Sequence, residues 1–321
     1  MPMKHESICI LGGTGFVGTR LVARLIKRGH QVTVLSRDRE QHKHLLVLPG
    51  LTLDNCNVYD EAQLSEQFRG KNVVINLVGI LNERGFGGGG FRRTHTELTR
   101  GVLQAARSAG VLRLLQVSAL KAATDAPSYY LQSKGEAERL IREQGENFDW
   151  TILQPSVMFG PGDSFLNRFA GLLASIPLVF PLARANARFQ PVFVDDVIDA
   201  LLCCLHGGAS SRRTYQLGGP QIYTLREIVG LVAKLTGRRR WIIGLPDFAA
   251  RLQGLVMNFV PGRPFSSDNY RSLKIDSVCT EDGFAQLKLK PHSMAASARQ
   301  YLGALEDNAR MSRDRAAAGR A

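Results

Sequence analysis

Short apolar runs and segments of helical periodicity alternate through the first half of the chain. Apolar runs predict strands, and apolar residues that recur every three or four positions predict helices between them. The expected strands span residues 7–11, 31–35, 51–55, 72–78, 112–117 and 150–154, and the expected helices span 16–28, 97–109 and 129–143. Strands joined by helices form parallel sheets with right-handed crossovers. The predicted fold class is therefore α/β: a doubly wound parallel sheet of the Rossmann type with a smaller, mixed C-terminal substrate lobe.

The pattern becomes irregular after Pro155, where glycine and proline are frequent. We therefore predict an NAD(P)-binding Rossmann domain over residues 1–155 and a smaller substrate or partner lobe over 156–303, with 190–200 as a candidate return to the Rossmann sheet. Residues 304–321 are rich in alanine and arginine, which predicts a disordered tail. Residues 245–260 have a broad apolar face, which fits a core helix or a surface helix that touches a lipid-like ligand or a membrane.

Glycines follow the first predicted strand and open the first predicted helix, in the sequence GGTGFVG. Gly12 permits a tight turn, Gly15 lets the backbone approach a pyrophosphate, and Gly18 lets the helix pack against the strand. Phosphates bind at such helix N-termini, where unpaired N–H groups face them. The strand–glycine–helix context predicts a dinucleotide site rather than a Rossmann fold that binds nothing. The expected contacts in this loop are Gly12, Thr14, Gly15, Phe16, Val17 and Gly18.

The second predicted strand ends at Ser36 and is followed by Arg37 and Asp38. A site that prefers NAD usually places an acid at this strand tip for the ribose 2′-hydroxyl. An arginine can instead bind a 2′-phosphate through paired hydrogen bonds. We therefore predict that Ser36 and Arg37 contact the cofactor, that Asp38 points elsewhere, and that NADP(H) is favoured over NAD(H). Arg20 is placed to assist.

Tyr130 and Lys134 lie four residues apart in the segment SYYLQSK, so a helix puts them on one face. A nearby ammonium stabilises a phenolate and lowers the pKa of a tyrosine. The pair can serve as a general acid or base, with Lys134 also holding the nicotinamide ribose. The predicted strand before this helix ends near Ser118, which is a further candidate catalytic residue.

Several stretches of the sequence resemble those of a known protein family. The matching stretches are GGTGFVG (12–18), VVINLVG (73–79), VSAL (117–120), YLQSKGEAE (130–138), LQPSVMFGPGDSFLNRFA (153–170) and QPVFVDDV (190–197). They resemble the atypical extended short-chain dehydrogenases/reductases, which are similar to NAD-dependent epimerases and dehydratases. More narrowly, they resemble the nucleotide-binding accessory subunit of respiratory complex I and its bacterial relatives. The resemblance implies bound NADP(H), with Leu77, Val78 and Gly79 beside the adenosine and Pro155 and Val157 near the nicotinamide.

One position departs from the active members of that superfamily. They place a serine or threonine after the fifth strand, and Leu120 occupies that position here. Without the hydroxyl, Tyr130 keeps a role as acid or base, but polarisation of a substrate oxygen is weaker. Three interpretations stay open for the Tyr130–Lys134 pair: it supports turnover, it only binds ribose, or its spacing is coincidental.

The charge and the cysteine content limit the kinds of partner that the protein can have. Lys and Arg number 41 against 28 Asp and Glu, a formal net charge of +13, with a run at Arg238–Arg240. No nucleic-acid-binding module is recognisable, so an anionic membrane surface or an acidic protein is the favoured partner. The five cysteines form no CxxC pair, which indicates reduced thiols in the cytoplasm, and no metal site is predicted. No apolar run is long enough to span a membrane.

Together these observations favour an NADP(H)-binding protein tied to respiratory complex I or quinone metabolism, with weak or no turnover. It would lie in the cytoplasm, with the cytoplasmic face of the inner membrane as a peripheral site, and a quinone-like or other hydrophobic ligand is a candidate second small molecule. If the protein is active, the expected chemistry is that of an NAD(P)-dependent oxidoreductase. One alternative is a soluble reductase, epimerase or dehydratase that acts on a nucleotide-sugar or similar metabolite. Another is a sensor whose occupancy by NADPH controls binding to a protein partner.

Overall fold

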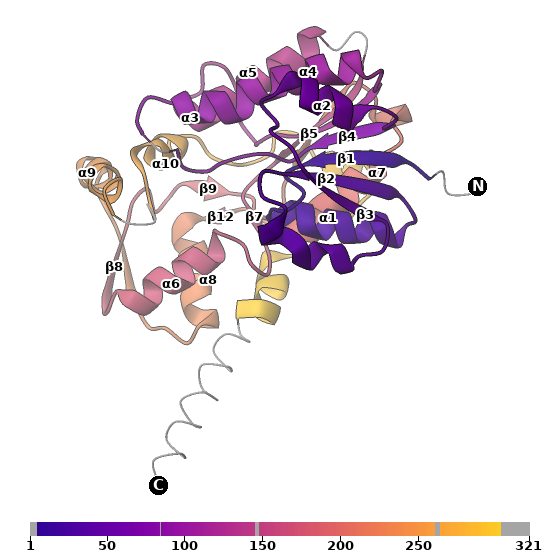
Figure 1. Cartoon of the computed structure of the whole chain (residues 1–321). Coiled ribbons are helices and arrows are strands. Elements are labelled where there is room, and N and C mark those ends of the chain that lie inside the picture. The colour runs from indigo at the N-terminus through magenta and orange to yellow at the C-terminus, as the bar shows by residue number, and fades with distance from the viewer. Residues whose placement is uncertain (1–4, 84, 145–147, 261–263, 303–321) are drawn as a thin grey trace. The chain divides into compact units, whose positions relative to one another are not determined.

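Seven parallel strands form the large sheet of the first of two structural units (Figure 1). The order of the strands is β11-β6-β5-β4-β1-β2-β3. Their bounds are β1 Ser7–Leu11, β2 Gln31–Ser36, β3 Leu51–Asn55, β4 Val73–Asn76, β5 Arg113–Val117, β6 Asp149–Pro155 and β11 Arg213–Leu217. The strand order reverses direction between β1 and β4, as in a doubly wound sheet. This confirms the predicted Rossmann architecture.

The structure is a computed structural model that describes residues 5–83, 85–144, 148–260 and 264–302. The first unit comprises residues 1–155, 197–217 and 281–289, and the second comprises 156–196, 218–280 and 290–321. The predicted disordered tail, 304–321, lies outside the described residues.

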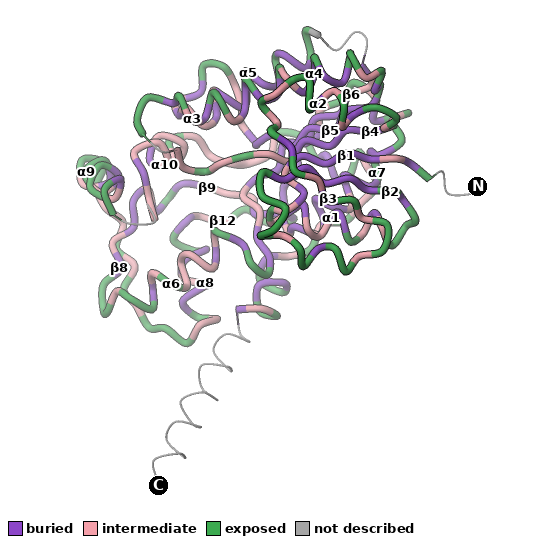
Figure 2. The backbone as a smooth tube through the Cα atoms, viewed as in Figure 1, coloured by how far each residue is buried: buried purple, intermediate pink, exposed green. Residues whose placement is uncertain are grey.

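Helices cover both faces of the large sheet (Figure 1). Helices α2 (Glu61–Phe68), α4 (Leu98–Ser108) and α5 (Tyr129–Gln144) lie on one face, and α1 (Phe16–Lys27) lies on the other. The central strands β1, β4 and β5 are almost wholly buried, whereas the edge strand β3 is not (Figure 2). Their apolar side chains and the inner faces of α2, α4 and α5 form one hydrophobic cluster, which includes Leu11, Val74 and Leu114.

The shorter helices of this unit occupy the connections. They are a 3₁₀ helix at Glu40–Val47, α3 (Gly89–Phe91), a π-helical turn at Arg92–Glu97, a 3₁₀ turn at Gly208–Ser210 and α11 (Gly283–Gln286). The carboxylate of Glu83 accepts the N–H groups of Gly88 at 2.7 Å and of Gly90 at 2.8 Å. These two bonds hold the glycine-rich segment in a defined turn that leads into α3.

The strand that completes the large sheet differs from our expectation. We proposed residues 190–200 as the return to the Rossmann sheet, but Val192–Phe193 (β10) pairs with Met158–Phe159 (β7) in a separate two-stranded sheet. The large sheet is completed by β11, which pairs in parallel with β6. Its sequence, RTYQL, is short and has only two apolar residues, Tyr215 and Leu217, so no apolar run marked it as a strand.

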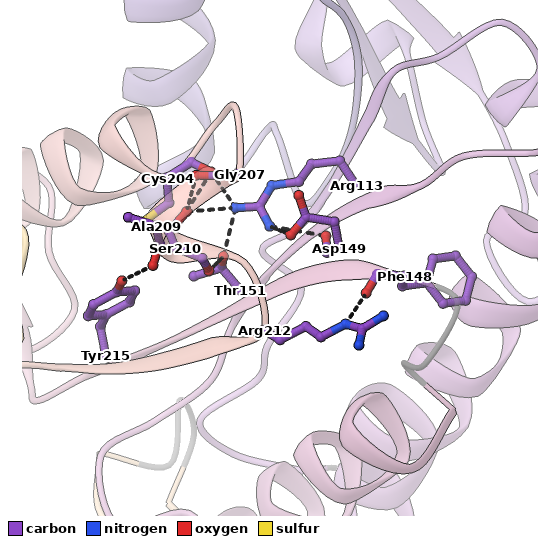
Figure 3. Close-up of polar contacts among 10 residues, drawn as sticks. All are labelled: Arg113, Phe148, Asp149, Thr151, Cys204, Gly207, Ala209, Ser210, Arg212 and Tyr215. Carbon is purple, nitrogen blue, oxygen red and sulfur yellow. Dashed lines mark hydrogen bonds and ion pairs between the residues drawn. The ribbon is translucent and has the colours of Figure 1, made fainter.

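A buried polar cluster joins the amino ends of β5 and β6 to the segment before β11 (Figure 3). Arg113 donates to the Asp149 carboxylate at 2.7 Å, to the Thr151 hydroxyl at 2.6 Å and to the Ser210 hydroxyl at 3.2 Å. It also donates to the carbonyl of Cys204. Burial lowers the pKa of the Arg113 guanidinium. Because strands bind nucleotides at their carboxyl ends, this cluster serves the fold rather than the predicted site.

The second unit is built from two-stranded sheets and short helices. Strands β7 and β10, β9 (Arg188–Phe189) and β12 (Tyr223–Thr224), and β8 (Val179–Leu182) and β13 (Trp241–Gly244) form the three pairs. Its helices include α6 (Leu166–Ser175), α8 (Leu225–Leu235), α9 (Asp247–Met257), α10 (Ser267–Ser272) and the start of α7 (Val194–Cys203), most of which belongs to the first unit. Residues 294–302 are helical as well. Its core gathers side chains of α6, α8 and β8, which include Leu173, Ile228 and Phe180.

Candidate functional site

The glycine loop between β1 and α1 excludes side chains at two motif positions. Gly12 has a left-handed φ of +78°, and its carbonyl accepts the Gly15 N–H at 3.1 Å. A Cβ at Gly18 would lie 2.3 Å from the Gly12 oxygen. Gly15 is different because it is exposed, and a Cβ there would meet only the Gly12 oxygen, at 3.3 Å. Open space therefore lies over Gly15, where a phosphate needs it.

The first turn of α1 supplies hydrogen-bond donors beside that space. The helix begins at Phe16 after Gly15 and continues through Val17 and Gly18, with Thr14 half-buried in the loop before it. The N–H groups of a first helical turn have no partner inside the helix, and the helix dipole makes that end positive. The first turn of α1 also holds no acidic residue. An anion is therefore favoured here.

Asp38 and Arg37, which follow the tip of β2, have different surroundings. The Asp38 carboxylate accepts the N–H groups of Glu40 at 3.0 Å and Gln41 at 3.3 Å, so it caps the 3₁₀ helix that follows. The buried Ser36 hydroxyl accepts the Asp38 N–H at 3.2 Å and fixes this turn. Arg37 is exposed beside it. The acid of this tip is thus engaged by backbone amides, and the arginine is the accessible charge.

The carboxyl ends of β4 and β5 meet at Lys134. The buried Lys134 ammonium donates to the carbonyls of Val78 at 3.3 Å and Val117 at 3.2 Å. A Cβ at Gly79 would lie 3.2 Å from the Lys134 nitrogen, so a glycine lets the lysine reach this position. Leu77, another predicted contact, comes just before Val78 and lies against Gly12 of the glycine loop. Burial lowers the pKa of Lys134 to about 8.

His95 is a buried residue of this site that sequence reasoning missed. Its Nε2 accepts the Ile80 N–H at 3.1 Å, so its Nδ1 carries the proton and donates to the Ser133 hydroxyl at 2.8 Å. That hydroxyl donates in turn to the Tyr130 carbonyl at 2.8 Å. Burial, followed by the charge of Lys134, lowers the pKa of His95 to about 2, so the imidazole is neutral. His95 lies on the π-helical turn Arg92–Glu97, and the pattern of apolar residues in that segment does not indicate this role.

Tyr130 does not show the lowered pKa that we expected. The phenol is half-buried, and its ring makes edge contacts with His95 and Phe91. Burial raises its pKa to about 12, and no lowering by Lys134 opposes that rise. The lysine charge is directed to the carbonyls of Val78 and Val117 instead. As the chain stands, Tyr130 is therefore a protonated phenol and not a phenolate at neutral pH.

Ser118 and Leu120 follow β5 beside the end of β6. The Ser118 N–H donates to the Leu153 carbonyl at 2.8 Å, and the Leu120 N–H donates to the Pro155 carbonyl at 2.9 Å. The Ser118 hydroxyl is buried and has no hydrogen-bond partner among the described residues. The Leu120 side chain is buried as well. Burying a hydroxyl without a partner costs free energy, so Ser118 is a group that a ligand would satisfy.

A family model described as NAD(P)H-binding matches residues 12–162. The mitochondrial NADH dehydrogenase [ubiquinone] 1 alpha subcomplex subunit 9 of Rattus norvegicus is 30% identical over 292 residues, which cover 88% of this chain and 76% of the relative. The chain belongs to the family of this NADH dehydrogenase subunit. A ceramide reductase of Caulobacter vibrioides is 28% identical over 75% of this chain and 74% of its own length.

Solved structures of other proteins share the fold of this chain. An NADPH-dependent quinone oxidoreductase of Escherichia coli, complexed with NADPH, superposes with a TM-score of 0.73 and 18% identity. The match covers 90% of this chain and 98% of that protein. At this identity the likeness shows a shared short-chain dehydrogenase/reductase fold.

The residues present fit a nicotinamide dinucleotide of the kind that the family model describes. The open cradle at Gly15 fits the pyrophosphate, and the buried Ser118 hydroxyl lacks a partner that a ligand would supply. Two N–H groups of Lys134 are used by backbone carbonyls, which leaves the third for a ribose hydroxyl. When bound, such a cofactor supplies hydride transfer chemistry.

Most predicted site residues of this family member fall together at the carboxyl ends of β1, β2, β4, β5 and β6 in the first unit. Val157 is the exception, since it belongs to the second unit, where its carbonyl accepts the Val192 N–H at 3.0 Å. Among the described residues, no group of three or more His, Cys, Asp or Glu side chains is arranged to hold a metal ion. Within the same residues, no helix is long and apolar enough to cross a bilayer.

Proposed function

We propose that this protein binds NADP(H) tightly at the glycine loop and acts as a subunit-like partner of respiratory complex I, with slow or no turnover. The observation that carries the proposal is the contrast between the two halves of the site. The half that would hold the dinucleotide is complete, from Gly15 to Lys134. The half that would polarise a substrate has Leu120 where active relatives of this fold need a hydroxyl.

The preference for the phosphorylated cofactor rests on the tip of β2. An acid facing the ribose would repel a 2′-phosphate, but the Asp38 carboxylate caps the next helix. Arg37 is exposed at the same tip. A guanidinium binds phosphate with charge-assisted hydrogen bonds, and this favours NADP(H) over NAD(H).

Slow turnover rests on the protonation of Tyr130. A general acid or base works best with a pKa near the working pH, and burial moves the pKa of Tyr130 to about 12. Lys134 and His95 serve cofactor binding in this proposal, because both support the strand ends that would contact the dinucleotide. Any substrate that is turned over would be a hydrophobic, quinone-like molecule, in keeping with the subunit family.

A membrane-peripheral location at the cytoplasmic face of the inner membrane completes the proposal. It is supported by the net charge of +13 and by membership of a family named for an NADH dehydrogenase that uses ubiquinone.

Calorimetric titration with NADPH, combined with the absorbance of the bound nicotinamide, tests the function. We expect stoichiometric binding, and oxidation of the bound NADPH by added quinone no faster in wild type than in Tyr130→Phe. Rapid, repeated oxidation that Tyr130→Phe abolishes would contradict the proposal and favour a reductase, as in the ceramide reductase relative.

A further inference from the structure

Helix α9 in the second unit presents its large apolar side chains to solvent. Phe248, Leu252 and Leu255 follow one another at spacings of four and three, with exposed fractions of 75%, 58% and 52%. Residues at these spacings lie on one face of a helix. Most helices of soluble proteins bury such a stripe, so this orientation needs an explanation.

The opposite face of α9 fixes the orientation of the helix. Ala250 is fully buried, and a Cβ at Gly254 would lie 3.3 Å from the carbonyl oxygen of Ser266. The Asn258 amide donates to the Ser267 hydroxyl at 2.9 Å and accepts the Ser267 N–H at 3.3 Å. Small and polar residues thus hold α9 close to α10. The core-helix interpretation of 245–260 is therefore wrong for the apolar stripe.

The strand pair β8–β13 carries a second exposed apolar surface. Trp241 and Ile243 alternate outward along β13, with exposed fractions of 77% and 49%. Trp241 pairs in register with Val179, and Leu178 before it is 77% exposed. The Gln253 amide of α9 donates to the Pro181 carbonyl of β8 at 3.3 Å, which ties the two surfaces together.

Basic residues border Trp241. Lys234, Arg238, Arg239 and Arg240 line a groove of about 810 Å³ together with Trp241 and Leu178. Arg240 is anchored, because its Nε donates to the Ile176 carbonyl at 2.8 Å. Lys234, Arg238 and Arg239 are exposed. The acid of α9, Asp247, accepts the Tyr270 hydroxyl at 2.7 Å and lies 3.6 Å from the Arg184 guanidinium, which offsets its charge within the unit.

We propose that this apolar–basic face, formed by α9, β8–β13 and residues 234–240, docks on a bilayer that contains anionic phospholipids. Exposed tryptophan and apolar side chains bordered by arginine and lysine are typical of segments that lie in the membrane interface. The basic groove binds headgroup phosphates while the stripe of α9 enters the acyl boundary. A second copy of the chain fits less well, because a twofold contact would bring two arginine clusters together. The inference names the surface for the membrane location proposed above and is independent of the nucleotide site.

Trp241 is a built-in reporter for the test. The chain has two tryptophans, and Trp150 is buried in the first unit. The full-length protein is mixed with vesicles of phosphatidylcholine, or of phosphatidylcholine and phosphatidylglycerol in equal parts. We expect a blue shift of tryptophan emission and co-sedimentation with the anionic vesicles, and neither with the neutral ones. The shift should be absent in Trp241→Phe, which keeps Trp150.

Matched variants separate the two parts of the face. The double variant Arg238→Gln/Arg239→Gln should bind anionic vesicles roughly 25-fold more weakly, about fivefold for each charge. Leu252→Ser should weaken binding by about tenfold. The control Leu112→Ser, at a leucine 66% exposed in the first unit, should leave it unchanged.

Two results would overturn the inference. One is an equal affinity of wild type, Leu252→Ser and the arginine double variant for anionic vesicles. The other is a blue shift that rises with protein concentration without vesicles and is lost in Leu252→Ser, which would identify self-association. NADPH binding is measured in every variant, so that a failure of the cofactor proposal is recognised separately.

Discussion

Replacing Arg37 by alanine should weaken NADPH binding far more than NADH binding. The two cofactors differ only in the 2′-phosphate, so the four affinities form a thermodynamic cycle that isolates the contact between Arg37 and that phosphate. Hydrogen bonds to charged groups contribute about 1.5–3 kcal/mol, and Arg37 is exposed, so solvent and salt screen the contact. We expect a coupling of about 1.5 kcal/mol, which corresponds to roughly a tenfold selective loss for NADPH.

The assay is calorimetric titration of wild type and variant with each cofactor at two salt concentrations. Arg39→Ala serves as the matched control, since Arg39 is an exposed arginine two residues further on. Asp38→Ala should destabilise the 3₁₀ helix that the carboxylate caps, without raising the affinity for NADPH. Equal losses for both cofactors in Arg37→Ala, or a marked gain for NADPH in Asp38→Ala, would refute the assignment of this strand tip.

Three further predictions concern folding and pH. Gly15→Ala should fold normally but lose dinucleotide binding, whereas Gly18→Ala should lower thermal stability because its Cβ would meet the Gly12 oxygen at 2.3 Å; normal melting of Gly18→Ala would contradict this packing. Because the pKa of His95 is about 2 when folded and 6.5 ordinarily, the unfolded chain takes up a proton below pH 6.5 that the folded chain does not. Stability should fall by about 1 kcal/mol between pH 6.5 and 5.5 and by about 1.4 kcal/mol for each pH unit below that, and melting curves of His95→Gln should lack this component. Arg113→Met should cost about 3 kcal/mol in urea unfolding by leaving Asp149 unpaired, and an unchanged midpoint would exclude that role.

The Rossmann architecture could be predicted from the sequence, because the spacing of apolar residues indicates which side chains are buried. The central strands β1 and β4 are near-continuous apolar runs, because both faces of the middle of a parallel sheet are covered. Strand β11 was not predicted because it is short, has only two apolar residues, and comes after residues 156–196, which belong to the second unit.

Candidate site residues could be proposed from sequence where a spacing has a clear physical use, as for glycines at a strand–helix turn and for a lysine four residues after a tyrosine on one helix face. Their roles stay predictions. His95 could not be predicted, because its role depends on a π-helical turn and on the backbone of Ile80, which is distant in sequence. The raised pKa of Tyr130 likewise depends on the degree of burial, which spacing alone does not give.

The most direct test of the central claim is mass spectrometry of the small molecules that the freshly purified protein releases on denaturation. The account predicts NADP(H) in near-stoichiometric amount. An empty protein, or one that releases NAD(H) or a nucleotide-sugar, would contradict it.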